Sequence, residues 1–506
     1  MKTINKYFLL IALIGVASAT YAQDYYDAQT FANSDLNGTA RFVAMGGALG
    51  ALGGDVSVMS TNPAGTGMYR SSDAALSVSG VFTGDGARGH DGARMSFDQG
   101  GVVIAFDMDN PTSKGLQFVN FGVNYQKKRN FLFNQNTNIT NFDNCFSQTY
   151  QIANLCNEAY RWDPNGNQWG LLADLSASLE GVHGTILDES GDEGYAGFPA
   201  EKAYYEKATY GSNSQVDVNL SFNLSDQIFL GASIGVYAID YNRESLYKET
   251  GVDGNSYHFN NWYKTSGDGF DVKLGFIFRP IENSPFRIGA YVHTPIWYRM
   301  TDSNGSELFL NDLPMYMPKS NAEFDYRYRT PWKFGVNIGH TIGQNFAIGA
   351  EYEFQDLCSM HYSEIDGIYS DYFHEMNKAM KETLRGQHTL KVGAEFKPID
   401  ELSFRVGYNF VSSPFKKDAY RTIGFGGPYT ETDYTNWGNI NRFTVGLGYR
   451  YKGGYFDLAW QYQAQNGDFY AFKDGYYDDE GGLHTLPPTK ITANRSQLMA
   501  TLGFRF

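Results

Sequence analysis

The side chains that most often carry chemistry are scattered along this 506-residue chain instead of lying at motif spacing. None of the nine histidines forms an H-x-x-x-H metal-ligand pair. The one G-x-S-x-G spacing, at 231–235, falls inside a stretch that we predict to be a strand, so it lacks the strand-to-helix turn of a nucleophile elbow. These spacings argue against a metallohydrolase and a serine hydrolase. We therefore expect no enzyme activity, no catalytic residue, no metal site and no cofactor.

The cysteines allow one redox interpretation. Cys145 and Cys156 lie in one long segment and could pair in an oxidising compartment, although two free thiols fit the sequence equally well. Cys358 would then be unpaired. No C-x-x-C spacing supports a zinc site.

A glycine-rich stretch at 44–54 is the second candidate for chemistry, because such loops can cradle phosphate. No strand-to-helix pattern surrounds it, which excludes a nucleotide site. Its small residues instead favour turns and close packing.

Two segments that we predict to be loops hold more apolar side chains than a solvated loop needs, and such clusters often mark binding sites. They could form a capture groove for an apolar ligand, pack on one another to brace the loops, or face membrane lipid and lipopolysaccharide. The candidates are Tyr257, Phe259, Trp262, Tyr263, Leu308, Phe309, Leu310, Leu313 and Met315.

The elements that would position these residues are strands. Apolar and polar side chains alternate with period two through 345–354, 389–396, 402–410 and 498–506, a pattern typical of a sheet with one apolar face. We predict about fourteen strands, near 73–82, 101–108, 115–126, 214–224, 227–240, 267–279, 285–298, 322–341, 344–355, 387–397, 400–411, 440–451, 454–464 and 494–506.

The connections alternate between short turns and long loops. The long ones cover roughly 127–213, 242–266, 299–321, 356–386, 412–439 and 465–493. This asymmetry and the even strand number predict an all-β fold, a transmembrane antiparallel β-barrel in the outer membrane of a Gram-negative cell. Pro331 should interrupt its strand, because proline cannot donate to a ladder.

The register predicts that the apolar set faces lipid and that a charged set lines the lumen, where opposite charges can pair across strands. The lumen set is Asp217, Asp271, Lys273, Arg287, Lys333, Glu351, Glu353, Lys391, Glu395, Arg405, Asp457 and Arg505.

The chain ends fit export. Lys2 and Lys6 precede a short apolar run and a small-residue site, which predicts a signal peptide over 1–22. The formal net charge of −15 excludes a general nucleic-acid binder. The C-terminal strand ends on Phe506, through which we expect recognition by the barrel-assembly machinery.

Residues 23–72 lack the strand pattern and precede the barrel, which spans 73–506. They can hang free or fold back into a lumen wide enough to need filling. Residues 40–48, then Gly53-Gly54-Asp55, then Asn62-Pro63-Ala64-Gly65 resemble the N-terminal hatch of the FadL family of fatty-acid and aromatic-hydrocarbon transporters, in a form like that of Bacteroidetes.

The resemblance implies a fourteen-strand barrel with an N-terminal plug and passive uptake of hydrophobic small molecules, which leave sideways beside the hatch. It places Asn62, Pro63, Ala64 and Gly65 in the hatch motif. Expected partners are the hydrophobic ligand and outer-membrane lipid and lipopolysaccharide, with the protein a monomer. The alternative is a FadL-like barrel that acts as an adhesin or a secretion-system partner, a role suggested by the long segment 127–213.

Overall fold

The computed structural model describes residues 24–506 except 111–113, 141, 143–146, 164–167, 172–187, 190–194, 282–283, 316–321, 422–430, 473–474 and 478–482. The predicted signal peptide lies outside the described residues. So does Cys145, and the structure therefore does not address its pairing with Cys156. Among the described residues, Cys358 is a free thiol.

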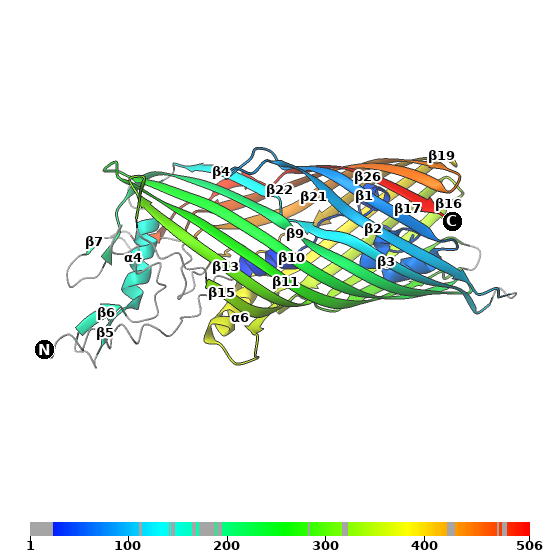
Figure 1. Cartoon of the computed structure of the whole chain (residues 1–506), viewed down its shortest axis with the longest axis horizontal. Helices are drawn as coiled ribbons and strands as arrows, with labels where there is room; N and C mark the ends of the chain where they lie inside the picture. The colour runs from blue at the N-terminus through cyan, green and yellow to red at the C-terminus, as the bar shows by residue number, and fades with distance from the viewer. Residues whose placement is uncertain are drawn as a thin grey trace.

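The fold is a closed antiparallel barrel of fourteen strands, which confirms the predicted class (Figure 1). The first strand pairs with the last, from Asp73 opposite Arg505 to Phe82 opposite Ser496, so the sheet has no free end. In order the strands are β1 (Asp73–Phe82), β2 (Ala93–Asp107), β3 (Leu116–Asn130) continued by β4 (Phe133–Ile139), β9 (Ala200–Leu224), β10 (Ile228–Gly251), β11 (Ser256–Phe278), β12 (Arg287–His293) continued by β13 (Trp297–Leu310), β15 (Ala322–Arg329) continued by β16 (Lys333–Ile342), β17 (Phe346–Asp356) continued by β18 (His361–Glu364), β19 (Gly386–Ile399), β20 (Leu402–Val411), β21 (Tyr434–Tyr451), β22 (Gly454–Tyr470), and β25 (Thr489–Thr492) continued by β26 (Arg495–Arg505).

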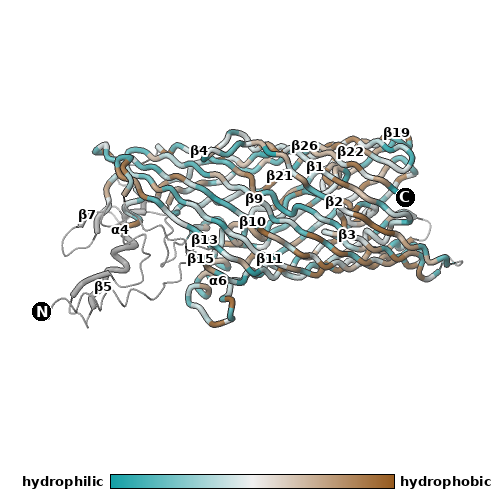
Figure 2. Tube along the Cα trace, in the orientation of Figure 1, coloured by the Kyte–Doolittle hydropathy of each residue, from teal (hydrophilic) through white to brown (hydrophobic). Residues whose placement is uncertain are grey.

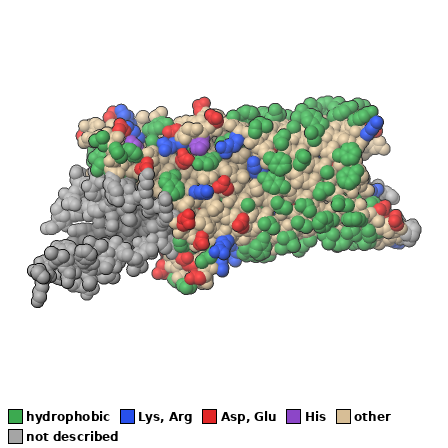
Figure 3. Space-filling model, viewed as in Figure 1, with side chains coloured by type: hydrophobic (Ala, Val, Ile, Leu, Met, Phe, Trp, Pro, Cys, Tyr) green, Lys and Arg blue, Asp and Glu red, His purple; other side chains and the backbone are tan. Residues whose placement is uncertain are grey.

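An apolar belt surrounds one half of the barrel, toward the end that holds the C-terminus (Figures 2 and 3). It consists of the outward side chains of the alternating strands, including Leu230, Ile234, Val236, Phe270, Leu274, Val336, Val445, Leu502 and Phe504. Such a belt is what a strand wall in lipid requires. Among the described residues, no helix is long and apolar enough to cross a membrane.

The barrel wall continues beyond this belt, toward the end opposite the C-terminus (Figure 1). Two segments that we predicted to be loops belong to this part of the wall. The segment 242–266 and the described part of 299–321 are largely strand: β10 pairs with β11 up to Thr250 opposite Ser256, and β11 pairs with β13 up to Tyr257 opposite Leu310. Here outward residues such as Asp240 and Glu244 are polar and inward ones such as Tyr241 and Tyr247 are aromatic. No lipid imposes an apolar outer face here, so the apolar-outward alternation on which the prediction relied is lost, while the backbone ladder persists.

The remaining elements lie mostly in the long connections. They are α4 (Gln148–Ala159), β5 (Tyr160–Asp163), β6 (Gln168–Leu171), β7 (Asp188–Glu189), β8 (Tyr195–Ala196), β14 (Leu313–Pro314), η4 (Leu357–Ser359), α6 (Asp371–Thr383), β23 (Gly475–Tyr477) and β24 (Leu483–Thr485). Helix α6 buries Phe373, Met376 and Met380 against the aromatic residues of β15 and β18. It thereby covers the barrel interior beside the shorter strands.

The break predicted at Pro331 is present, since β15 ends at Arg329 and β16 begins at Lys333. A second break, which we did not predict, separates β12 from β13 at 294–296. The two breaks lie side by side, and the Thr330 amide donates to the Ile296 carbonyl at 3.1 Å. Both contain a proline, which explains the missing ladder bonds.

Most of the predicted charged lining is buried and paired inside the apolar belt. Lys273 contacts Asp217 at 2.6 Å and Asp271 at 2.7 Å, and Lys391 contacts Glu351 at 2.7 Å. Arg405 links Glu395 and Asp457. These charges have partners, so the prediction that opposite charges pair across strands in the lumen is correct for them.

The N-terminal segment fills the lumen, as the plug prediction required (Figure 1, blue). It forms α2 (Tyr25–Ala32), α3 (Ala40–Ala44) and the 3₁₀ turns η1 (Val56–Ser60) and η2 (Pro63–Met68). A β-carbon on Gly231 would overlap the Pro63 backbone, and one on Gly393 would overlap the Met45 carbonyl. Glycine in the wall therefore lets the plug backbone lie directly against the strands.

Candidate functional site

The motif 62–65 lies at the start of η2, deep in the lumen. Asn62 caps η2 by accepting from the Ala64 amide at 3.2 Å, and its side-chain amide donates to the Phe276 carbonyl of β11 at 3.4 Å. The Thr66 hydroxyl, one residue beyond the motif, donates to Asn219 of β9 at 2.6 Å. The motif therefore joins the plug to the β9–β11 wall.

The candidate capture residues do not form an open groove. Tyr257, Phe259, Trp262 and Tyr263 lie on β11, and Leu308, Phe309 and Leu310 lie on β13, so their assignment to loops is wrong. Tyr257, Phe259 and Leu308 are buried in a cluster with the first turns of α4 and with Phe469 and Phe472. Leu313 and Met315 are exposed at the β13–β14 hairpin.

This cluster braces the mouth of the barrel. The Gln148 backbone amide, at the start of α4, donates to the Glu249 carboxylate at 2.9 Å. The Tyr257 hydroxyl donates to the same carboxylate at 3.0 Å. The long connection after β4 is thus anchored inside the mouth. An open capture surface at these buried aromatics is inconsistent with this packing.

A break in the barrel wall lies between β2 and β3. Their ladder ends at Gln99 opposite Gln126, although β2 stays paired with β1 as far as Ala93 and β3 stays paired with β9 as far as Asn130. A bulge at Asp98 starts the separation. Residues 93–98 and 127–130 therefore face each other without ladder bonds, and we call this opening the window.

A short piece of the plug, residues 33–37, occupies the window, and we call it the strap. The Asp35 amide donates to the Lys128 carbonyl at 2.9 Å, and the Asp35 carboxylate accepts from the Asn130 amide at 2.9 Å. The Asn37 side-chain amide donates to the Lys127 carbonyl at 3.0 Å and to Asp98 at 3.1 Å. The strap thus takes the place on the β3 edge that β2 leaves open.

Within the described part of the chain, docking of the strap leaves two buried polar atoms without a partner. One side-chain oxygen each of Asn37 and Asp98 is buried without a hydrogen-bond partner among the described residues. Each such atom costs about 1–3 kcal/mol, whereas each bond made contributes only about 1 kcal/mol. The membrane side of the window carries Met95, 76% exposed, and Phe97, which stacks on Tyr125. The two unsatisfied atoms lower the net free energy gained by docking and so favour release of the strap from the β3 edge.

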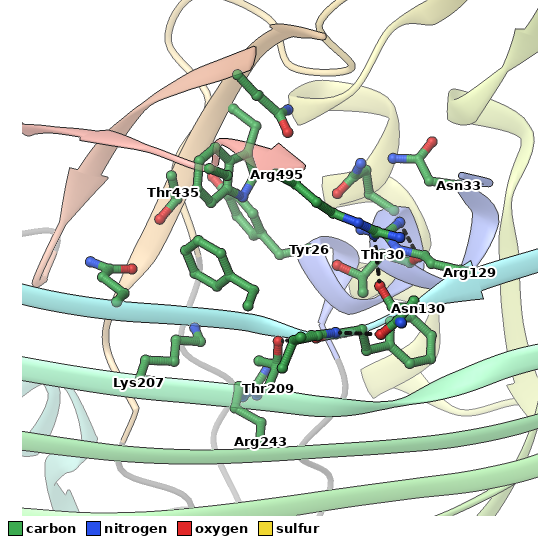
Figure 4. Close-up of a pocket in the computed structure, with 18 of the residues that line it drawn as sticks. Tyr26, Thr30, Asn33, Arg129, Asn130, Lys207, Thr209, Arg243, Thr435 and Arg495 are labelled. Carbon is green, nitrogen blue, oxygen red and sulfur yellow. Dashed lines mark hydrogen bonds between the residues drawn. The ribbon is translucent and has the colours of Figure 1, made fainter. Parts of the chain in front are cut away.

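A cavity of about 180 Å³ lies in the lumen beside the strap and α2 (Figure 4). A second, of about 100 Å³, shares Asn33, Asp35 and Arg442 with the first. The strap therefore borders both cavities and the window. Figure 4 shows Arg129 and Arg495 pointing into the larger cavity, where Arg129 donates to the Thr30 carbonyl at 2.6 Å.

Most charges around the larger cavity are paired. Arg243 contacts Asp27 at 2.6 Å, Arg421 contacts Asp24 at 2.6 Å, Lys207 contacts Asp433 at 3.1 Å, and Arg495 contacts Asp35 at 2.8 Å. These ion pairs fix α2 and the strap to the wall.

Asp35 is the strap residue that interacts with the arginines beside the cavity. Burial acts to raise the pKa of its carboxyl, but Arg495, Arg129 and Arg442 outweigh burial and lower the pKa below its usual value. Asp35 is therefore ionised at neutral pH. One carboxylate then faces three guanidinium groups.

The described residues contain no group of three His, Cys, Asp or Glu side chains placed to hold a metal ion. What the arrangement can do is bind and pass a small molecule between cavity, strap and window.

Sequence reasoning missed the window, the strap and the cavity arginines. Two local signals were present: Asp98-Gln99-Gly100-Gly101 breaks the strand alternation, and Lys127-Lys128-Arg129 places three cations where a strand meets the predicted loop. We assigned the cations to a loop, since a charge run usually marks solvent.

No family model matches this chain, and no curated protein matches it significantly. Among solved structures, a Pseudomonas aeruginosa FadL homologue aligns over 94% of this chain and 100% of its own, with a TM-score of 0.51 and 14% identity. The deltaS2 mutant of the TodX monoaromatic hydrocarbon channel aligns over 93% and 100%, with a TM-score of 0.50 and 10% identity. At these identities the likeness establishes a shared fold.

Proposed function

We propose that this chain is a FadL-type outer-membrane channel that takes up hydrophobic small molecules passively and releases them sideways through the window. The observation that carries the proposal is the strap, a plug segment seated in a wall opening that joins the lumen cavities to the apolar belt. A sealed barrel with an uninterrupted wall would have no need of it. The fold shared with a FadL homologue and with a monoaromatic hydrocarbon channel supports the same function.

The proposed path follows from the geometry. Short turns face the periplasm in such barrels, so the cavities open toward the outside and the plug closes the periplasmic end. A ligand in the larger cavity reaches lipid once the strap leaves the β3 edge. Because the exit lies beside Met95 and Phe97, the ligand passes from protein to membrane without crossing water.

We further propose that the protein is a monomer that inserts through its C-terminal strand, where the Phe506 ring is exposed and its backbone pairs with Ser72. Leu313 and Met315 remain the candidates for first contact with ligand, because both are exposed at a hairpin tip. The adhesin or secretion alternative rests on the length of the segment 127–213 alone.

The function is tested by uptake into cells whose outer leaflet is lipopolysaccharide, the layer that retards hydrocarbons. Cells that produce the protein should take up labelled toluene several times faster than cells that produce an unrelated barrel at equal level. Entry of labelled arabinose should not change, because the plug leaves no aqueous pore. Equal stimulation of both solutes, or of neither, would refute the proposal.

A further inference from the structure

Three cations around the strap have no carboxylate partner among the described residues. Arg442 and Lys128 are buried, and Arg129 is half-buried. Arg442 donates only to neutral oxygens, those of Gln463 at 2.8 Å and Asn409 at 2.9 Å. The Lys128 ammonium lies over the Tyr237 ring at 5.4 Å. Arg129 and Arg442 line the larger cavity, and every other cation in its lining has its own carboxylate.

This charge excess calls for an anion. Burying a charge is costly unless an opposite charge or several hydrogen bonds compensate for it. Asp35 compensates for one guanidinium group, since its ion pair is with Arg495 at 2.8 Å. Arg129 and Arg442 both line the larger cavity, so a bound anion there would meet two guanidinium groups that the protein leaves uncompensated.

The rest of the lining indicates the shape of the ligand. Aromatic rings surround the same cavity: Tyr26, Phe131, Phe133, Tyr241, Tyr434 and Trp437. Phe133 and Trp437 meet edge to face at 5.5 Å, an arrangement that presents ring faces and edges to a planar guest. The volume of about 180 Å³ is close to the roughly 150 Å³ of a cavity that binds benzene. One ring with a small substituent fits, whereas a long alkyl chain does not.

We propose that the cavity binds a compact aromatic anion, a single-ring carboxylate, with its charge at Arg129 and Arg442 and its ring among the aromatic side chains. The proposal rests on the proposed function and narrows the ligand class within it. A charged ligand also approaches the partners of Asp35, so its binding competes with the carboxylate that ties the strap to Arg495.

The test is calorimetric titration of the purified full-length protein with benzoate and with benzamide, a neutral molecule of nearly the same shape. Benzoate should bind at least tenfold more tightly than benzamide. The substitutions Arg442→Gln and Arg129→Gln should each weaken benzoate binding at least tenfold and leave benzamide unchanged. Arg327→Gln, which removes an exposed charge from the outer face of β15, is the matched control and should change neither.

Two variants are used so that misfolding of one does not decide the result, and heat-modifiable migration on gels identifies folded barrels. Equal binding of benzoate and benzamide, or wild-type benzoate affinity in both folded variants, would overturn the proposal. Normal toluene uptake together with failed benzoate binding would leave the proposed function intact and reject only the anionic ligand. Benzoate binding without any hydrocarbon uptake would support the anionic ligand and reject the proposed uptake of hydrocarbons.

Discussion

Deleting residues 24–68 is expected to convert the closed barrel into an ion-conducting pore. The wall closes on itself between β1 and β26 without help from the plug, and its inner face is charged and polar. Water can therefore fill the emptied lumen, and fourteen strands enclose more space than the side chains of the wall can fill. Single-channel conductance in planar bilayers should rise roughly tenfold or more over the intact protein, which should show almost none.

A matched deletion separates the two parts of the plug. Removal of residues 24–32 takes away α2 but leaves α3, η1 and η2 against the wall. This shorter deletion should stay closed to ions, because the lower plug still blocks the lumen. If the long deletion folds and its conductance remains that of the intact protein, the wall itself closes the lumen, and the plug is not the barrier.

The double substitution Asp35→Ala with Asn37→Ala is expected to accelerate hydrocarbon uptake. It removes the bonds from these side chains to Asn130, Arg495, Lys127 and Asp98. At about 1 kcal/mol per bond, the strap loses about 4 kcal/mol of docking energy. If strap release limits exit, the initial rate of toluene uptake into lipopolysaccharide-coated cells should rise by roughly threefold or more.

The control for this variant changes the same residue types elsewhere. Asp107→Ala with Asn110→Ala alters the turn between β2 and β3 at the opposite end of these strands, where both side chains make local turn bonds. It should leave uptake unchanged. A double strap variant that folds and takes up toluene at the wild-type rate would show that strap docking does not limit passage.

The barrel itself was predictable because lipid imposes its own pattern on the sequence. Wherever one face of a strand meets hydrocarbon, apolar residues must recur at every second position, as in 402–410 and 498–506. The same logic placed Lys273, Asp217 and Glu351 in the lumen, where they are found paired. Pro331 marked a strand break for a backbone reason that is independent of context.

The upper barrel and the site were not predictable for a shared physical reason. Beyond the belt, the outer faces of β10 and β11 are polar and the inner faces mix aromatic and polar residues, so the strands lack the apolar-outward period that the prediction used. The window is an absence of such bonds, and its strap is fixed by contacts between residues 35–37 and strands about ninety residues away in sequence. Arg129, Arg442 and Arg495 likewise meet only because the barrel closes.

The central claim, that ligand leaves through the window when the strap moves, is tested most directly by tying the strap in place. Asn37→Cys and Asp98→Cys, made with Cys145, Cys156 and Cys358 replaced by Ser, put thiols on two side chains that now share a hydrogen bond across the window. A short dithiol reagent should join them, and toluene uptake should fall to the rate of cells without the protein, while either single-cysteine variant treated alike keeps its rate. Undiminished uptake in the fully cross-linked protein would contradict lateral exit through this window.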